Sequence, residues 1–465
     1  MTDLTRGPIG RHIVSMAGFI GAALLFQSAY FMVDLYFVSR IGKEAVAGVS
    51  TAGNFLYLAL AAAQLVGVGS LSLISQAIGR KDEAYARLVF NQVLVMSALL
   101  AVVALVAGYA SAGWAARGLG ADAGSAAFGK SYLYAYLPSL AVMFPGTVLG
   151  ASLRATGVVR PTMLLQTASV LLNVVLAPVL IAGWGTGHPL GAFGAGLASS
   201  IASVISLIVI VAILPRIQTQ LRVELAGMRP RLAVWLSLIK VGLPAAGEFF
   251  LLFTFNAVLY WSIRRFGPAA QAGYGIGARL MQAMFLPTMA ISFAAAPIAG
   301  QNFGAGLRAR VMETFRTSLL YGTCLMLGLT ALCQAKPEWL AGAFTQDPGV
   351  LAIACQFLRM ISWNFVAVGV GFACSGMFQA LGDTLPGFYS SASRLVTFAM
   401  PCVLLSYYPP AVLPDFWVAS IISATVQAGL SLWFLREVFR NKLGALPVRG
   451  EFGLGEAVGA GGGQE

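Results

Sequence analysis

Apolar residues along this chain fall into twelve runs of about 20 to 31 residues, which short polar stretches separate. A helix of about 20 apolar residues crosses the hydrocarbon core of a bilayer, whereas the strands of a membrane barrel need only about 9 to 11 alternating residues. The pattern therefore predicts an all-α membrane protein with twelve transmembrane helices. The runs lie at about 13–38, 45–75, 88–111, 129–152, 162–184, 191–214, 236–262, 270–298, 315–334, 349–378, 387–408 and 414–436.

The sequence also repeats itself at a constant offset of 225 residues, through loops and helices alike and without a gap. Each copy holds six of the runs, so the copies share one orientation and an axis along the membrane normal relates them. We therefore expect two pseudo-symmetric lobes of six helices. The matching landmarks are Arg40 and Gly42 with Arg265 and Gly267, Gln76 and Gly79 with Gln301 and Gly304, and Ala155, Gly157 and Pro161 with Ala380, Gly382 and Pro386.

The repeat and the polar stretches together predict the domain organisation. An N-lobe takes residues 1–214, a basic cytoplasmic linker takes 215–235, and a C-lobe takes 236–440. The Gly-rich tail, 441–465, lacks apolar periodicity and is expected to be disordered.

Composition and charge predict that the chain lies in a membrane, and they predict its orientation there. Hydrophobic residues make up 58% of the chain and charged residues 10%, which a soluble domain does not show. The net charge of +12 does not indicate nucleic-acid binding, because the basic residues, Arg80, Lys81 and Arg154 among them, flank alternate loops. The positive-inside rule then places both termini in the cytoplasm of a bacterial-type inner (plasma) membrane. The first run lacks a cleavage site and is interpreted as a retained helix.

Asp34 is the most informative residue, because it is a carboxylate inside the first apolar run. A charge at the bilayer centre costs about 2.5 to 3.5 kcal/mol, so such residues usually serve ion pathways. An acid that faces a cavity there can exchange a proton for cationic cargo or sodium. The alternative is a structural acid that reaches Arg40 or the interface. The repeat places Leu259 at the equivalent position, so the halves are unequal.

Glu248 is the second carboxylate well inside a run, near Pro244 and towards the cytoplasmic side. We interpret it as a candidate cavity residue or second acidic site; the alternative is a partner for a polar neighbour at the Pro244 break. Arg279, Arg359 and Arg394 lie in or near apolar runs and fit snorkelling as well as substrate contact.

The sequence offers no site for an enzyme or a metal. His12 is amino-terminal and His188 is in a loop, so neither can act as a buried base. The cysteines sit in apolar runs without metal-ligand spacing and are expected to pack as free thiols. We expect no enzymatic activity and no cofactor.

Three segments resemble the multidrug and toxic compound extrusion (MATE) family, and the match spans nearly the whole chain. They are Val33–Gly42 at the end of the first run, Pro297–Gly306, and Gln379–Thr384. The resemblance implies a V-shaped fold of two lobes, alternating access, and export of organic, often cationic, compounds against inward proton or sodium flow. Asp34 then matches the family's coupling acid.

The resemblance also implies partners for Asp34. Asn173 matches an Asn of the family's cation site, and Ser199 resembles its hydroxyl position. The family's frequent second Asp falls on Ala177, which leaves fewer anionic oxygens for sodium and favours protons. The first-helix proline of many relatives is Phe19 here, so this chain lacks that bend residue.

The expected function is a secondary active antiporter that exports organic, cationic small molecules or drugs by alternating access, in exchange for inward protons or, as the alternative, sodium. Its partners are a small-molecule substrate and the lipid bilayer, and we expect a monomer. The alternative is a flippase for a lipid-linked saccharide precursor, which Arg279 and Arg359 would serve by holding phosphate. The residues expected to line the cavity are Tyr36, Asn256, Arg279 and Gln282.

Overall fold

A computed structural model describes residues 3–119, 123–185, 187–217 and 220–444. Within these ranges, the side chains of 29–35, 43–44, 46–57, 114–119, 123, 125 and 225 are not described. The described chain holds 12 helices that are long and apolar enough to span a membrane. This confirms the predicted number of transmembrane helices.

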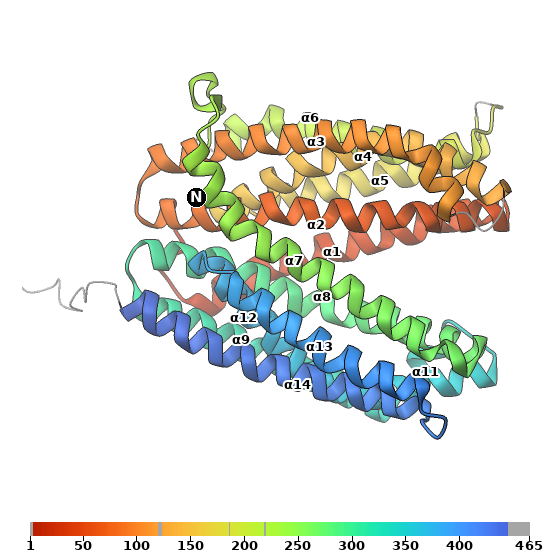
Figure 1. Ribbon diagram of the computed structural model, residues 1–465. Coiled ribbons are helices and arrows are strands. Elements are labelled where there is room, and N and C mark those ends of the chain that lie inside the picture. The colour runs from red at the N-terminus through yellow and green to blue at the C-terminus, as the bar shows by residue number, and fades with distance from the viewer. Residues whose placement is uncertain (1–2, 120–122, 186, 218–219, 445–465) are drawn as a thin grey trace, which may run out of the picture.

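The first six helices form one lobe and the remaining ones form the other (Figure 1). The tenth membrane span consists of two α-helices that the 3-10 turn Ser362–Asn364 joins. The N-lobe helices are α1 (Ile9–Ser39), α2 (Lys43–Gly79), α3 (Glu83–Leu119), α4 (Ala123–Ala155), α5 (Arg160–Ala182) and α6 (Gly191–Ile217). The C-lobe helices are α7 (Leu232–Ile263), α8 (Pro268–Gly304), α9 (Arg308–Ala335), α10 (Pro337–Ala341), α11 (Pro348–Ile361), α12 (Phe365–Leu381), α13 (Leu385–Tyr407) and α14 (Leu413–Val438).

The duplication is visible in the backbone. The helix α8 begins and ends 225 residues after α2, and α13 begins and ends 225 residues after α5. The turns repeat as well: Lys81 and Gly306 both have a positive φ, of 61° and 76°, directly after α2 and α8. The two lobes are therefore copies of one six-helix unit.

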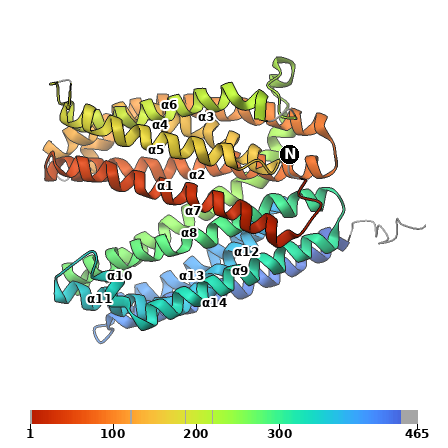
Figure 2. The ribbon, with the colours of Figure 1, turned by 180° about the vertical axis from the view of Figure 1, so that it is seen from behind.

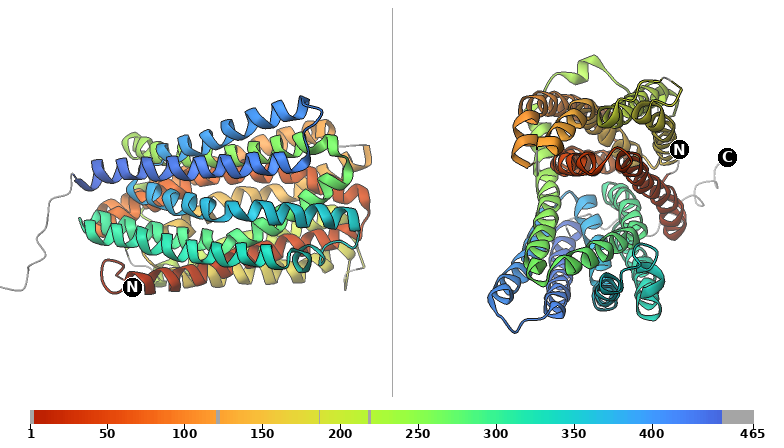
Figure 3. Two further views of the ribbon diagram at one scale, coloured as in Figure 1. Left: turned by 90° about the horizontal axis from the view of Figure 1, so that it is seen from below. Right: turned by 90° about the vertical axis from the view of Figure 1, so that its right-hand side faces the viewer.

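The lobes form a V (Figure 2). They approach each other near the ends of α2 and α8, at Gly79 and Gly304, which we call the closed end. They diverge towards the end of α1 at Ser39, which we call the open end. The helices α1 and α7 pass from one lobe to the other: α1 contacts α8 and α9, and α7 contacts α2 and α3 (Figure 3).

The contact at the closed end is reciprocal. A Cβ on Gly79 would overlap the carbonyl oxygen of Gln301, and a Cβ on Gly304 would overlap that of Gln76. The Gln76 amide donates to the carbonyl of Ala380 over 2.9 Å, while the Gln301 amide donates to that of Ala155 over 2.7 Å. Each contact maps onto the other by the 225-residue repeat. Small residues allow helix backbones to approach this closely in lipid.

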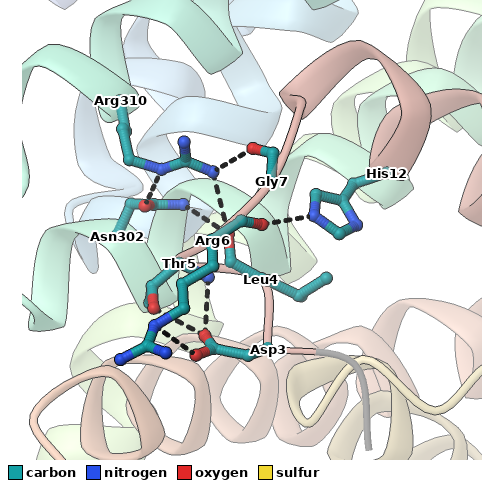
Figure 4. A network of polar contacts seen from close by, with 8 residues as sticks. All are labelled: Asp3, Leu4, Thr5, Arg6, Gly7, His12, Asn302 and Arg310. Carbon is teal, nitrogen blue, oxygen red and sulfur yellow. Dashed lines mark hydrogen bonds and ion pairs between the residues drawn. The ribbon is translucent and has the colours of Figure 1, made fainter.

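A short strap precedes the first helix of each lobe and binds the opposite lobe. The segment 3–7 holds to the C-lobe, because Arg310 donates to the carbonyl of Gly7 over 3.0 Å and Asn302 donates to that of Leu4 over 3.1 Å (Figure 4). The second strap, which we call the linker strap, is the segment 227–231 before α7, and it contacts α3. The Gln92 amide of α3 donates to the carbonyls of Gly227 and Arg229 over 2.6 and 2.7 Å. The straps tie the lobes together at the closed end.

Two helix ends lie within the predicted linker. The helix α6 continues through Pro215 to Ile217, and α7 begins at Leu232, so both helix ends lie inside the range 215–235 that the sequence predicts for the linker. Val234, in the first turn of α7, is buried.

Candidate transport site

A cavity of about 190 Å³ lies between the lobes beside the closed end. Helices α1, α2, α4 and α5 of the N-lobe provide most of its wall, and Phe293 of α8 and Gln379 of α12 provide the C-lobe side. Four amide side chains and one guanidinium give a membrane-embedded space an unusually polar wall. These polar residues are Gln27, Gln64, Arg154, Gln166 and Gln379.

Arg154 is the charged residue of this wall. It lies in the last turn of α4, and it is half-buried. Among the described residues, no hydrogen bond or ion pair reaches its guanidinium. Gly150 leaves space beside it, since a Cβ there would lie 3.5 Å from Nη1 of Arg154 and 3.6 Å from Cγ2 of Thr162.

Glu248 connects to the cavity through a chain of hydrogen bonds in the C-lobe. The Ser375 hydroxyl donates to Oε2 of Glu248 over 3.1 Å, and the Gln379 amide donates to the Ser375 hydroxyl over 3.4 Å. Gly387 on α13 faces the other carboxylate oxygen, because an added Cβ there would overlap Oε1. The acid thus lies behind Gln379, on the C-lobe side of the cavity wall.

The structure brings Asn173 of α5 and Ser199 of α6 together in the N-lobe. Both are fully buried, and the Asn173 amide donates to the Ser199 hydroxyl over 3.4 Å. Oδ1 of Asn173 is buried and has no hydrogen-bond partner among the described residues. Ala177, one turn further along α5, is also fully buried. An unpaired acceptor and a hydroxyl in an apolar core are groups that a cation or a proton donor can use.

Asp34 lies in α1, but its side chain is outside the described residues. Its neighbour Tyr36 is exposed and accepts a hydrogen bond from Arg40, whose guanidinium also lies over the Tyr36 ring, 4.7 Å from the centroid. Arg40 therefore has a partner at the open end.

The other residues expected at the cavity do not line the space beside the closed end. Arg279 and Gln282 are exposed on α8. Asn256 is exposed on α7, where it accepts a hydrogen bond from the Tyr274 hydroxyl over 3.2 Å. Arg359 forms an ion pair with Glu338 over 2.7 Å, with both side chains about half exposed.

Arg154 was not predicted to line a cavity, because in the sequence it belongs to the basic residues that flank loops. A signal was present: Arg154 and Gln379 are equivalent in the repeat, and Gln379 belongs to one of the three recognised segments. Within the described residues, His, Cys, Asp and Glu form no group of three that could hold a metal ion.

Comparison with known proteins identifies the family. The MatE family model matches residues 20–179 and 244–404, one match in each lobe. The chain belongs to the MATE family. The two matches cover most of both copies of the repeat, and the linker lies between them.

Curated relatives are similar over most of their length. The multidrug export protein MepA of Staphylococcus saprophyticus is 24% identical over 77% of this chain and 79% of its own. The FAD transporter of Shewanella oneidensis is 25% identical over 87% of this chain and 90% of its own. This MATE chain is thus similar to relatives named for quite different cargo.

Solved MATE structures share the fold. A structure described as the outward-facing conformation of a multidrug resistance MATE family transporter has a TM-score of 0.88, with 21% identity over 94% of this chain and 98% of its own. A transporter of the MOP superfamily from Pyrococcus furiosus has a TM-score of 0.87, with 21% identity over 95% and 98%. The V of two six-helix lobes is therefore a MATE fold.

Proposed function

We propose that this MATE transporter is a secondary antiporter, which exports organic small molecules by alternating access in exchange for inward protons. The cavity between two lobes that meet at one end carries the proposal, because a cavity of this kind changes its exposure when the lobes rock. The helices α1 and α7, which contact both lobes, would guide that movement.

The orientation follows from the basic residues at the closed end. Arg80 and Lys81 follow α2, and Arg308 and Arg310 follow α8. The positive-inside rule places these residues and both termini in the cytoplasm, in an inner (plasma) membrane. The V then opens to the outside.

Protons are the coupling ion in this proposal, and Asp34 is the acid that binds them. The buried pair of Asn173 and Ser199 provides polar neighbours in the same lobe, and Ala177 provides no second carboxylate. Sodium would have to lose its water to few anionic oxygens, whereas a proton needs one carboxylate. Glu248 is a second candidate acid, with Ser375 as its hydrogen-bond donor.

Organic cations are the expected cargo because the candidate acids attract positive charge, and the names of the MepA relatives agree with a drug exporter. The flippase alternative depended partly on Arg359. Its ion pair with Glu338, on half-exposed side chains, supports a structural use of this arginine instead. We propose transport without enzymatic activity or a bound cofactor, by a monomer.

Proteoliposomes loaded with ethidium, an organic cation, test the coupling. Asp34→Asn should abolish proton movement driven by ethidium, because an amide does not titrate in this range. Glu248→Gln should lower the rate about tenfold, as expected for loss of a charge-assisted hydrogen bond of about 1.5 kcal/mol. The exposed acid on α9 gives the control Glu313→Gln, which should transport normally. Undiminished coupled transport by Asp34→Asn would refute the role of that acid.

A further inference from the structure

Arg154 is a membrane-embedded cation whose charge is not neutralised by any described residue. Buried charges are normally paired, because removal from water costs several kcal/mol that a partner must offset. Arg154 instead lines a cavity, half-buried, in the last turn of a transmembrane helix. Its position suggests that the missing partner comes from outside the chain.

The surroundings of Arg154 add hydrogen-bond donors rather than acids. The amides of Gln64, Gln166 and Gln379 line the same cavity. The Thr162 hydroxyl belongs to the same wall, and its oxygen has no hydrogen-bond partner among the described residues. A guanidinium with hydroxyl and amide donors beside it is suited to the oxygens of a phosphate or carboxylate.

The positive charge of Arg154 has no counterpart at the equivalent position of the C-lobe, Gln379. The positions of Arg154, Gly150 and Thr162 in the N-lobe correspond to Gln379, Ser375 and Gly387 in the C-lobe. The C-lobe set surrounds Glu248, whose own equivalent in the N-lobe is Ala23, a residue of the cavity wall. Among the described residues, the N-lobe thus places a basic side chain in the cavity wall, and the C-lobe places an acidic one behind it.

We propose that Arg154, with Thr162 and the neighbouring amides, forms a subsite for an anionic phosphate or carboxylate group. This inference rests on the proposed transport function, since the group would belong to the transported compound. The subsite lies beside the closed end, so the anionic part of the compound would enter the V first. The compound therefore carries at least one negative group, alone or together with a positive one.

Pyrophosphate is a simple probe for this subsite. Sodium pyrophosphate should raise the Tm of the purified protein above its value in sodium chloride of equal ionic strength, because a ligand that binds the folded state stabilises it. Arg154→Gln, which gives the N-lobe the residue of the C-lobe, should lose this rise. Arg154→Lys should keep part of it, because a lysine keeps the charge but not the planar fork. Arg316→Gln, at an exposed arginine of α9, should keep it all.

A phosphate can also belong to a lipid headgroup, so a second arm adds phosphatidylglycerol to delipidated protein. A rise in Tm with pyrophosphate alone identifies a soluble anion as the ligand. A rise with the lipid that also requires Arg154 identifies a headgroup. If neither probe raises the Tm of the wild type, or if Arg154→Gln responds as the wild type does, the subsite is refuted.

The same variants separate this inference from the transport proposal. Asp34→Asn should lose ethidium-driven proton movement but keep the rise in Tm with pyrophosphate. Arg154→Gln should lose the rise in Tm, and this binding result alone decides the anion subsite, because Arg154 lines the transport cavity itself. If wild-type protein shows no ethidium-driven proton movement, the proposed function is refuted. The anion subsite would still be supported by the rise in Tm with pyrophosphate.

Discussion

The two lobes share a backbone but differ in charge. Their contact at the closed end is symmetric: glycine meets glutamine carbonyl in both directions, and each glutamine amide reaches the opposite lobe. The residues near the cavity are not symmetric. The unequal pairs near the cavity are Ala23 and Glu248, Gly150 and Ser375, and Arg154 and Gln379. Away from the cavity wall, Asp34 and Leu259 are a further unequal pair of the repeat.

The symmetric contact and the unequal cavity residues meet two different structural requirements. A contact on the pseudo-two-fold axis must fit itself, so both copies need the same small residues there. A cavity that binds one compound gains from unequal walls, since each charge can then contact a different group. The duplicated scaffold therefore supplies the movement, and the differences between the copies supply the chemistry.

The largest expected effect comes from breaking the symmetric contact. Gly79→Ala or Gly304→Ala places a methyl group against a backbone carbonyl of the other lobe, so the lobes must separate. We expect loss of most ethidium transport, and destabilisation of about 1–3 kcal/mol, as overpacking usually costs. Transport assays and thermal unfolding check both quantities.

Gly328→Ala is the matched control, because nothing lies within 4 Å of a Cβ at this position of α9. It should transport normally, since alanine is the better helix former. Equal transport by Gly79→Ala and Gly328→Ala would contradict the closed-end contact.

A smaller effect distinguishes the two glutamines of the contact. Both make one hydrogen bond across the lobes, but Gln301 is only 2% exposed whereas Gln76 is half-buried. Gln301→Ala should cost about 1–2 kcal/mol because it leaves a buried carbonyl unpaired, and Gln76→Ala should cost less. Thermal unfolding of the two variants measures the difference. Equal losses would mean that water reaches both carbonyls alike.

The sequence predicted the scaffold well because length and repetition determine it. An apolar run must cross the membrane as a helix, and a constant offset requires two similar lobes. The cavity was harder to predict. Arg154 lies at a helix end, where a basic residue usually meets the interface, and only the packing of the lobes shows that it lines a cavity. The role of Asp34 stays a prediction, since its side chain is not described.

The two hydrogen bonds between a glutamine amide and a backbone carbonyl at the closed end could not be predicted from the sequence either. Sequence alignment placed Gln76 on Gln301 and Ala155 on Ala380, but it could not show that the four form two hydrogen bonds. That contact depends on how closely the lobes approach, which hydrophobic periodicity does not encode.

The smallest expected effect compares the two straps. The N-terminal strap has an exposed ion pair between Arg6 and Asp3 at 3.5 Å, while the linker strap is tied through Gln92. The hydrogen bond from the Thr5 hydroxyl holds the pKa of the Asp3 carboxyl below its usual value. The carboxylate therefore stabilises the strap at neutral pH, and this contribution is lost as the pH falls through the lowered pKa. Asp3→Asn should cost at most about 0.5 kcal/mol, because both charges are exposed. Gln92→Ala should cost more, and a larger loss from Asp3→Asn in thermal unfolding at pH 7 would reverse this ranking of the straps.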